Sequence, residues 1–524
     1  MPVPATAIAR TMVRRGLAAP ATPPHRVARQ LAALKAWGYG LAGQVRASAA
    51  LAPDRVAVLD RERSLTYTQL RERGDAVAVL LRERGIGRTN RVGLLADNGT
   101  AGILGMVAAS TLGADTVLLN PGAPADQVAA AVTAHGVDLV LHDADLSQLT
   151  AAVEVPAVDL AALIDAAPAR PPRLTPPGRT AQAIMLTSGT TGRPKAAPRK
   201  PPAGLSGLVS IIERIPLRSH DEVLISAPLF HTWGYAALQV TFGVQGTVLL
   251  QRRYDPAAAH GLLVDHGAAA WVAVPIMLHR MVRWADTADP VEPARLRVIA
   301  CSGSRLDPDL VGAVRSRFGE VLYNLYGSTE ASWVTIATPA DLRRDPATAG
   351  TPPLGTTVEL LDDRGRPVAD GEPGRFHVHN EMTFDGYLDG ESPALRDGLL
   401  PTGDLGRRRD GLYFVDGRAD QIVVVGGENV LPGELEDALR ALDGVADAAA
   451  VGLPDAEYGQ RLVAAVVLEA GADRDAESLR VEVAGRVARA ARPREIRLAG
   501  ELPRTTTGKV ALPELRAMLG APAG

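Results

Sequence analysis

Several kinds of residue are scarce in this chain, and cysteine is the scarcest. Cys301 is the only cysteine among 524 residues. No disulfide can therefore form within the chain, which fits the reducing conditions of the cytoplasm. Cys301 directly follows the apolar run Val298–Ala300. This position predicts a buried, small hydrophobic side chain rather than a reactive thiol.

Lysine is nearly as rare. Arginine supplies almost all of the positive charge, and the only lysines are residues 35, 195, 200 and 509. Lys195 and Lys509 lie in stretches that are rich in glycine and hydroxyl side chains. A lysine in such a setting suggests a need for a compact point charge instead of the planar guanidinium fork.

Long apolar runs and a strong net charge are also absent. No uncharged stretch is long and hydrophobic enough to span a bilayer, and residues 1–20 lack the apolar core of a secretory signal peptide. The net charge of −3 provides no general attraction for nucleic acid or for an anionic membrane. With 46% hydrophobic and 22% charged residues, the composition is globular, and the length predicts more than one domain.

Acidic residues are missing from the start of the chain, where Asp54 is the first. Basic residues instead alternate with apolar ones, as in Val27–Leu34. We predict a basic N-terminal extension over residues 1–45. Three roles stay open for it, namely packing on the body of the protein, which is favoured, peripheral contact with a membrane, and a transit peptide.

From residue 56 onward, short apolar runs alternate with segments of helical periodicity. Val56–Leu59 and Arg91–Leu95 are typical of strands, and residues 103–112 are typical of an apolar helix. This alternation predicts an α/β fold with parallel sheets covered by helices. We further expect buried strands at 271–277 and 296–301, a linker at 166–177, a small β subdomain at 355–375 and a helix at 476–490.

The first stretch that carries chemistry follows the apolar run Ile184–Leu186. It is a loop of hydroxyl side chains and glycines that closes on a lysine, and its members are Thr187, Ser188, Gly189, Thr190, Thr191, Gly192 and Lys195. Glycines let backbone N–H groups turn inward, hydroxyls add donors, and the lysine suits phosphate oxygens. The spacing differs from that of a Walker A loop. The loop therefore indicates a polyphosphate site, with a polar surface turn as the alternative.

A second stretch combines an aromatic residue, an amide, hydroxyls and a carboxylate. Its members are Asn324, Tyr326, Gly327, Ser328, Thr329 and Glu330. An aromatic ring can stack on adenine and an amide can bind its amino edge, while a hydroxyl and a carboxylate can reach phosphate and Mg²⁺. The alternative is a tyrosine-rich strand that ends in a polar turn.

The two motifs together resemble the signature sequences of the adenylate-forming superfamily, which includes acyl-CoA synthetases, peptide-synthetase adenylation domains and luciferases. The phosphate loop matches the family pattern through Lys195 and departs from it at Ala196, where glycine is usual. Residues 326–330 meet the family pattern Tyr-Gly-x-Thr-Glu in full. The resemblance spans roughly residues 46 to 520 and is closest to bacterial fatty-acyl-CoA synthetases, especially at 227–234 and 426–432.

The resemblance implies a large N-terminal adenylation domain over residues 46–417, built from α/β subdomains with parallel sheets and a small β subdomain. It also implies a mobile, small α+β C-terminal domain over residues 418–524, which carries the catalytic lysine. The two domains are expected to rotate about a hinge between the steps of the reaction.

The resemblance further implies roles for individual residues. Tyr326 is expected to contact adenine, Thr329 to contact phosphate, and Glu330 to bind Mg²⁺. The remaining expectations are an acyl-pocket gate at His231, an adenine-side turn at Gly303, Ser304 and Arg305, ribose or phosphate contacts at Asp404 and Arg418, a hinge at Asp420, room for pantetheine at Gly426 and Gly427, and a catalytic lysine at Lys509. Arg305 and Gln421 depart from the usual family residues.

The implied reaction uses ATP, Mg²⁺ and CoA. A carboxylate attacks the α-phosphorus of ATP, pyrophosphate leaves, and the acyl-adenylate is then transferred to the thiol of CoA. The expected acid is a medium- or long-chain fatty acid. The low aromatic content of 4% weakly favours an aliphatic pocket over an aryl pocket.

Three alternatives stay open. The acceptor can be a carrier-protein thiol, the activated group can be another acid or an oxyanion such as nitrite with transfer to an amine, or the chain can be a catalytically silent nucleotide-binding protein. No nucleic-acid partner is expected. The oligomeric state, monomer or homodimer, is left open.

Overall fold

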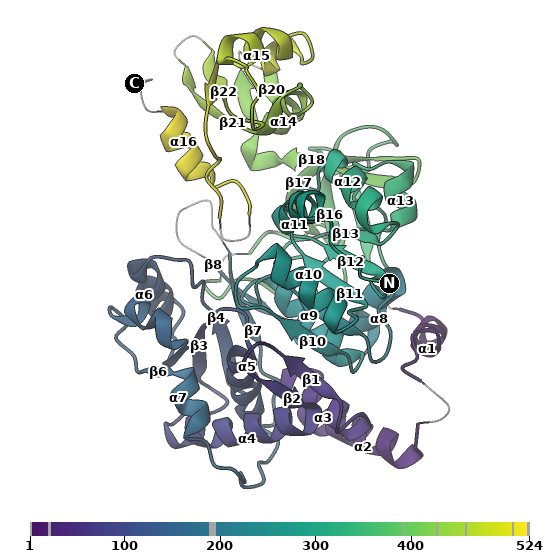
Figure 1. Ribbon diagram of the computed structural model, residues 1–524, viewed down its shortest axis with the longest axis vertical. Helices are drawn as coiled ribbons and strands as arrows, with labels where there is room; N and C mark the ends of the chain where they lie inside the picture. The colour runs from purple at the N-terminus through teal and green to yellow at the C-terminus, as the bar shows by residue number, and fades with distance from the viewer. Residues whose placement is uncertain are drawn as a thin grey trace. The chain divides into compact units, whose positions relative to one another are not determined.

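The computed structural model describes residues 3–18, 22–187, 195–390, 392–425, 428–455, 458–505 and 508–520. The chain divides into two compact units (Figure 1). The first unit comprises residues 1–357 and 378–400, and the second comprises residues 358–377 and 401–524. Within the described ranges, no helix is both long and apolar enough to cross a membrane.

The first unit alternates strands with helices along most of its length. Its helices are α1 (Ala5–Arg14), α2 (Pro24–Trp37), α3 (Leu41–Leu51), α4 (Tyr67–Glu83), α5 (Thr100–Leu112), α6 (Ala125–Ala134), α7 (Leu160–Asp165), α8 (Ser206–Arg214), α9 (Thr232–Gly243), α10 (Pro256–Asp265), α11 (Pro275–Ala288), α12 (Pro308–Phe318) and α13 (Pro339–Arg344). Its strands are β1 (Val56–Leu59), β2 (Ser64–Thr66), β3 (Arg91–Leu95), β4 (Asp115–Leu118), β5 (Leu139–His142), β6 (Ala157–Asp159), β7 (Ala183–Thr187), β8 (Lys195–Arg199), β9 (Glu222–Ile225), β10 (Thr247–Leu250), β11 (Ala270–Ala273), β12 (Val298–Cys301), β13 (Leu322–Tyr326) and β14 (Thr335–Ala337).

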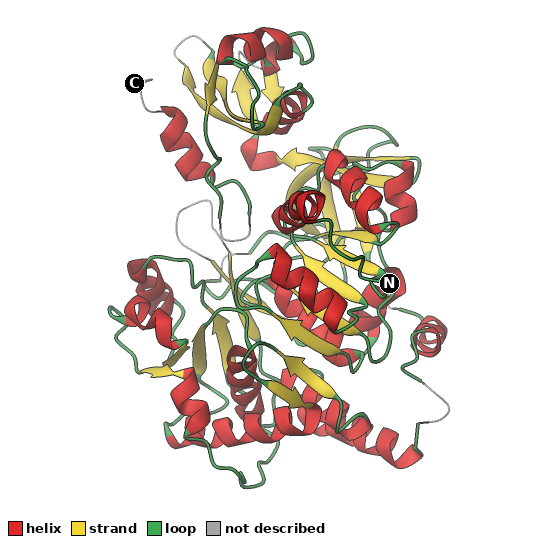
Figure 2. Ribbon diagram, viewed as in Figure 1, coloured by secondary structure: helices red, strands yellow, loops and turns green. Residues whose placement is uncertain are grey.

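These strands form two mainly parallel sheets accompanied by helices (Figure 2). The eight-stranded sheet has the order β14-β13-β12-β11-β9-β10-β1-β2, and the six-stranded sheet has the order β6-β5-β3-β4-β7-β8. Antiparallel pairing occurs where β2, β8 and β14 join their neighbours. Because both faces are covered, strands such as β11 and β12 are buried at every residue, which explains their unbroken apolar sequences. The predicted α/β fold with parallel sheets is confirmed.

Asn98 links the two sheets. It lies in the loop after β3 of the six-stranded sheet and is 8% exposed. Its Nδ2 donates to the carbonyl oxygens of Ile225 at 3.4 Å and Ala227 at 3.1 Å, and its Oδ1 accepts from the N–H of Leu229 at 2.8 Å. Ile225 ends β9 of the eight-stranded sheet, and Ala227 and Leu229 lie in the segment that follows it. One buried amide therefore satisfies backbone groups at the end of a strand in the other sheet.

The second unit contains two sheets of its own. The first has the order β15-β16-β17-β18, and the second has the order β20-β19-β22-β21 with β23 beside β22. The strands are β15 (Thr357–Leu361), β16 (Gly374–His379), β17 (Leu400–Arg409), β18 (Leu412–Arg418), β19 (Val423–Val425), β20 (Glu428–Val430), β21 (Val445–Asp455), β22 (Gly459–Leu468) and β23 (Glu495–Leu498), and the helices are α14 (Pro432–Arg440), α15 (Ala476–Val483) and α16 (Leu512–Gly520).

Strand β22 shows how this unit forms two cores. Leu462 and Ala464 face one cluster, which includes Leu435 of α14, whereas Val463 faces the other cluster, which includes Leu515 of α16. Successive side chains of a strand point to opposite faces. A strand with an apolar residue at nearly every position can therefore support a core on each side of its sheet.

Two expected elements have wrong limits. The strand expected at 271–277 ends at Ala273, and Pro275 begins α11, because proline fits the first turn of a helix. The helix expected at 476–490 ends at Val483, just before Gly485, a residue type that favours helix ends. The expected domain boundary between 417 and 418 falls inside the second unit, at the end of β18, and it stays a prediction.

The N-terminal segment contacts the body of the first unit. Arg15, which follows α1, donates from Nε to the carbonyl oxygen of Ile212 at 2.8 Å and from Nη2 to that of Glu213 at 3.0 Å. Both acceptors belong to α8. Helix α3 is part of the core, where Val45 is fully buried. A membrane contact of this segment stays a prediction.

We predict that Asn98→Ala destabilises the first unit by about 2–4 kcal/mol, because it leaves buried backbone groups without partners. Urea unfolding followed by tryptophan fluorescence measures the change. Asn120→Ala is the matched control, since its Oδ1 accepts one local bond from Gly122 in an exposed turn. Its cost should be about 1 kcal/mol or less. Equal losses in the two variants would contradict the linking role of Asn98.

Candidate active site

The candidate site of the first unit lies where parallel strands end. Strands β9, β11, β12 and β13 run parallel to one another, so the segments that follow them lie at one edge of the sheet. Those segments hold His231 after β9, Gly303 after β12 and Thr329 after β13. Ligands of open α/β sheets usually bind outside the carboxyl ends of the strands. The topology thus gathers motifs that are separated by up to about a hundred residues in the sequence.

The phosphate loop connects two hydrogen-bonded strands. Thr187 ends β7 and Lys195 begins β8, and the two residues are partners in the antiparallel register. Ser188, Gly189, Thr190, Thr191 and Gly192 lie outside the described residues. The Nζ atom of Lys195 is 5.3 Å from the ring centroid of Tyr387. A cation over an aromatic face is held by the ring quadrupole, so Tyr387 helps to orient the lysine.

Tyr387 also contacts the carboxylate of the second motif. Its hydroxyl donates to Oε1 of Glu330 at 2.7 Å, and the carbonyl oxygen of Glu330 accepts from the N–H of Phe384 at 2.9 Å. Leu388 donates from its N–H to the carbonyl oxygen of Ala196 at 3.0 Å. The segment 384–388 is therefore bonded to both motifs, and it brings the lysine of one near the carboxylate of the other.

Thr329 is connected to the gate segment. The hydroxyl of Thr232 donates to Oγ1 of Thr329 at 3.1 Å. Thr232 begins α9, and His231 is the residue that caps this helix, with its ring 4.2 Å from that of Phe230. The predicted gate histidine thus lies next to a residue that touches the predicted phosphate-binding threonine.

Two glycines lie in the segments that are predicted to contact adenine. Gly303 has a φ of 107°, a value that favours glycine, and it follows β12 beside the half-buried Ser304 and the exposed Arg305. At Gly327, an added Cβ would lie 2.2 Å from the carbonyl oxygen of Ser332, so a larger residue cannot fit without moving the backbone. Strands β12 and β13 are neighbours, and Asn324 is in register with Cys301. Gly303–Arg305 and Tyr326–Ser328 therefore lie at adjacent strand ends.

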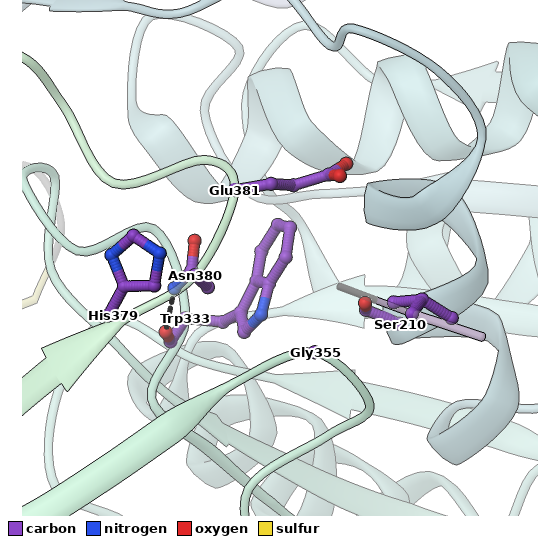
Figure 3. Close-up of a pocket in the computed structure, with 7 residues that line it drawn as sticks. Ser210, Trp333, Gly355, His379, Asn380 and Glu381 are labelled. Atoms are coloured by element: carbon purple, nitrogen blue, oxygen red, sulfur yellow. Dashed lines mark hydrogen bonds between the residues drawn. The ribbon is translucent and has the colours of Figure 1, made fainter. Parts of the chain in front are cut away.

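A pocket of about 270 Å³ lies beside Trp333, Asn380 and Glu381 (Figure 3). It is lined by Val3, Ser210, Trp333, Gly355, His379, Asn380 and Glu381. Asn380 is buried, and its Nδ2 donates to the carbonyl oxygens of Ala331 and Trp333, each at 2.8 Å. This amide braces the loop that carries Thr329 and Glu330.

The second unit brings together three further predicted residues. Asp404 of β17 is in register with Arg418 of β18, and Nη1 of Arg418 lies 3.6 Å from Oδ1 of Asp404. Arg418 also bonds both oxygens of Asp420, at 2.9 and 3.0 Å. Gly403 has a φ of 81°, and an added Cβ there would lie 2.9 Å from Nη2 of Arg418. The arginine is thus held between the predicted ribose ligand and the predicted hinge.

Lys509 lies on a tight turn of the second unit. Thr505 donates from its N–H to the carbonyl oxygen of Lys509 at 2.7 Å, and Gly508 has a φ of 80°. Arg504 is paired with Asp447 of β21, which attaches the turn to the sheet. The side chain of Lys509 is exposed. Gly426 and Gly427 lie outside the described residues.

A divalent cation at the candidate site would be coordinated by few protein side chains. In the described part of the chain, no group of three or more His, Cys, Asp or Glu side chains is placed to hold a metal. Glu330 offers one carboxylate. This fits Mg²⁺, which is commonly bound by one or two carboxylates together with substrate phosphates and water.

The sequence analysis missed Tyr387, Thr232, Asn98 and Asn380. Tyr387 contacts Glu330 and Lys195, and Thr232 forms a hydrogen bond with Thr329. Neither tyrosine nor threonine marks a site by itself. The polar and aromatic run 383–387 was the sequence feature that could have pointed to Tyr387. Its residue spacing matches no pattern that identifies a role.

Family models and relatives among known proteins match most of this chain. The family described as AMP-binding enzyme matches residues 45–388, and the AMP-binding enzyme C-terminal domain matches residues 434–509. The chain is 30% identical to indoleacetate–CoA ligase of Aromatoleum aromaticum, over 90% of this chain and 96% of that protein. It is 27% identical to the long-chain-fatty-acid–CoA ligase FadD13 of Mycobacterium tuberculosis, over 87% and 93%. Among solved structures, the amide bond synthetase McbA of Marinactinospora thermotolerans is 28% identical, with a TM-score of 0.81 over 91% of this chain and 99% of that one.

We predict that Tyr387→Phe slows ATP–pyrophosphate exchange roughly 10–100-fold, the value of a hydrogen bond to a charged group. The variant keeps the ring near Lys195 and removes the hydroxyl that bonds Glu330. Exchange of labelled pyrophosphate into ATP measures the rate. Tyr413→Phe is the matched control, because its hydroxyl bonds the carbonyl oxygen of Val358 in the second unit. An unchanged rate in Tyr387→Phe would contradict the orienting role.

Proposed function

Since the chain belongs to the AMP-binding enzyme family and is an AMP-forming acid–thiol ligase, we propose that it activates a medium- or long-chain aliphatic acid as its acyl-adenylate and transfers the acyl group to CoA. The observation that carries this proposal is the cluster of Lys195, Tyr387 and Glu330 beside Thr329. It combines a compact cation, a fixed carboxylate and a hydroxyl at the carboxyl ends of parallel strands. These groups suit a polyphosphate and the metal ion that accompanies it.

The first half-reaction is an attack of the acid's carboxylate oxygen on the α-phosphorus of ATP. An O–P bond forms, the bond to the bridging oxygen breaks, and pyrophosphate leaves. Lys195 is proposed to bind phosphate oxygens, Thr329 to donate to one of them, and Lys509 to neutralise charge that develops on the attacking and phosphoryl oxygens. Mg²⁺ held at Glu330 would supply further charge stabilisation. Positioning and electrostatics carry the step, so no protein nucleophile is needed.

The second half-reaction replaces AMP by a thiol. We propose that the C-terminal part rotates about Asp420, which withdraws Lys509 and lets Gly426 and Gly427 line the path of pantetheine. In the structure, Asp420 holds Arg418 through two hydrogen bonds. Rotation at Asp420 would break this pair in one orientation of the C-terminal part and form it again in the other. The pair can therefore favour one of the two orientations.

The aliphatic substrate is proposed from the apolar helix that follows His231. We propose that apolar residues after His231 line a tunnel for the acyl chain, namely Tyr235, Ala236, Leu238 and Val240, all of which lie on α9. Tyr235 and Leu238 belong to the buried core. An apolar pocket rewards each buried methylene by about 0.8 kcal/mol, so affinity should rise with chain length until the pocket is filled.

A second candidate function is transfer of the acyl group to an amine. The observation that favours it is the 28% identity to an amide bond synthetase over nearly the whole chain. Activation of an oxyanion such as nitrite, a carrier-protein acceptor and a silent nucleotide-binding role are the remaining alternatives. A silent binder has no need for the exposed Lys509.

One panel tests the proposed function. AMP and pyrophosphate are measured with straight-chain acids of increasing length and with nitrite, each with CoA, with an amine or with neither. The proposal expects turnover that rises with chain length and product formation that needs CoA. A flat response to length together with turnover on nitrite, or amide formation without CoA dependence, would select one of the alternatives.

We predict that Lys509→Ala slows adenylate formation by about 10²–10³-fold, the cost of one transition-state electrostatic contact. Thioester formation from preformed acyl-adenylate should be nearly normal, because Lys509 is proposed to leave the site after the first step. Both half-reactions are measured separately. Lys200→Ala is the matched control, since Lys200 is an exposed lysine paired with Asp385 at 3.1 Å. Equal loss of both half-reactions in Lys509→Ala would contradict the assigned role.

A further inference from the structure

Arg199 is a buried cation at the end of β8, and its side chain has no charged partner in the described part of the chain. The residue is 7% exposed. Its Nε and Nη1 atoms are inaccessible to solvent, and within the described ranges neither has a hydrogen-bond partner. A buried guanidinium without hydrogen bonds or a counter-ion is strongly unfavourable, so such a group usually has a partner that is bound separately.

The other buried arginines differ from Arg199 in that the fold provides hydrogen-bond acceptors for them. Three arginines are buried in the described part of the chain, namely Arg15, Arg46 and Arg199. Arg46 forms an ion pair with Asp75, and Arg15 donates to two backbone carbonyl oxygens of α8. The fold therefore satisfies two of these guanidinium groups with its own oxygens. For Arg199 the described chain supplies none.

Tyr235 of α9 is the neighbour whose ionisation is coupled to that of Arg199. Burial lowers the pKa of the Arg199 guanidinium to about 10, and interaction with Tyr235 opposes that shift. Burial raises the pKa of the Tyr235 phenol to about 12, and Arg199 opposes that shift in turn. Near neutral pH the arginine is therefore charged and the phenol keeps its proton. The two side chains together offer a cation and an O–H donor, which are complementary to an anion.

The position of Tyr235 relates this pair to the acyl gate. The N–H of Tyr235 donates to the carbonyl oxygen of His231 at 3.0 Å, which closes the first turn of α9. Residues four apart lie on the same face of a helix, about 6 Å from each other along the axis. Tyr235 thus lies one helical turn beyond the residue that is proposed to gate the acyl group, and Arg199 is its electrostatic neighbour.

We propose that Arg199 and Tyr235 bind a second anionic group, a carboxylate or sulfonate, at the end of the acid substrate that does not react. This inference rests on the proposed function and specifies its substrate class. The planar fork of arginine can bond both oxygens of such a group. A separation of one to two helical turns corresponds to a saturated diacid of about five to ten carbons. The apolar residues of α9 would then contact the methylene chain between the two ends.

The test compares diacids and monoacids of equal length, with CoA and ATP, in the wild type, Arg199→Leu, Arg199→Lys and the control Lys200→Met. The readout is the ratio of kcat/KM for the diacid to kcat/KM for the monoacid. We expect a ratio well above one in the wild type and in the control. Arg199→Leu should lower the ratio roughly 10–100-fold, as for one lost charge-assisted bond, and Arg199→Lys should restore part of it. A wild-type ratio below one, or a ratio that Arg199→Leu leaves unchanged, would overturn the proposal.

A binding measurement separates this inference from the proposed function. Thermal unfolding of the full chain is followed with adipate, suberate, hexanoate or octanoate, without CoA. The wild type should be stabilised more by each diacid than by the matched monoacid, and Arg199→Leu should lose that difference. If no acid yields AMP or thioester while the diacid stabilisation depends on Arg199, the proposed function fails and the anion site stands. If thioester forms but no diacid preference is found in either assay, the anion site fails and the ligase function stands.

Folding of the variant is checked in the same assay. Without ligand, Arg199→Leu should unfold at the same temperature as the wild type or at a higher one, because the substitution removes an unpartnered buried charge. A clearly lower unfolding temperature for both Arg199→Leu and Arg199→Met would show that Arg199 stabilises the fold itself, which would overturn the proposal.

Discussion

A parallel sheet that is covered on both faces can present polar groups where its strands end. Backbone N–H and C=O groups within the sheet are paired with one another, and the side chains between them are buried in apolar clusters. Polar residues that bind a ligand are therefore placed in the connecting segments. In this protein the segments after β9, β12 and β13 share one edge because their strands are parallel neighbours or nearly so. The parallel order of the strands is therefore the first requirement of the candidate site, because it brings the segments with the polar residues to the same edge.

Two hydrogen-bonded contacts turn that shared edge into an organised site. Tyr387 holds the carboxylate of Glu330 and lies against Lys195, and Thr232 bonds Thr329. Each contact joins segments that belong to different strands. Tyr387 thus keeps the lysine and the carboxylate near each other, and these two groups suit the oxygens and the metal of a nucleotide. Asn98 and Asn380 stabilise the same region through backbone carbonyl groups.

The buried arginines of the first unit differ in whether the described chain provides a partner for the guanidinium group. Arg15 and Arg46 have partners within the fold, and they attach the N-terminal helices to the body. Arg199 is buried beside Tyr235, and within the described ranges its Nε and Nη1 atoms have no such partner. A charge that the fold leaves unsatisfied beside a substrate path is more informative about the substrate than the apolar residues around it, because apolar side chains accept many acyl groups and a buried cation accepts few.

The sequence by itself determined the fold class and the chemistry of the individual motifs. Unbroken apolar runs alternating with helical periodicity are a local property, and they predict parallel sheets because strands covered on both faces need no polar positions. Glycine and hydroxyl residues ending in Lys195, and the run from Tyr326 to Glu330, are also local. Tertiary structure decided which of these residues meet, and it added partners such as Tyr387, which lies 57 positions from Glu330. It also decided that Arg199 is buried without a counter-ion among the described residues, which the sequence cannot show because burial and pairing depend on segments far apart in the chain.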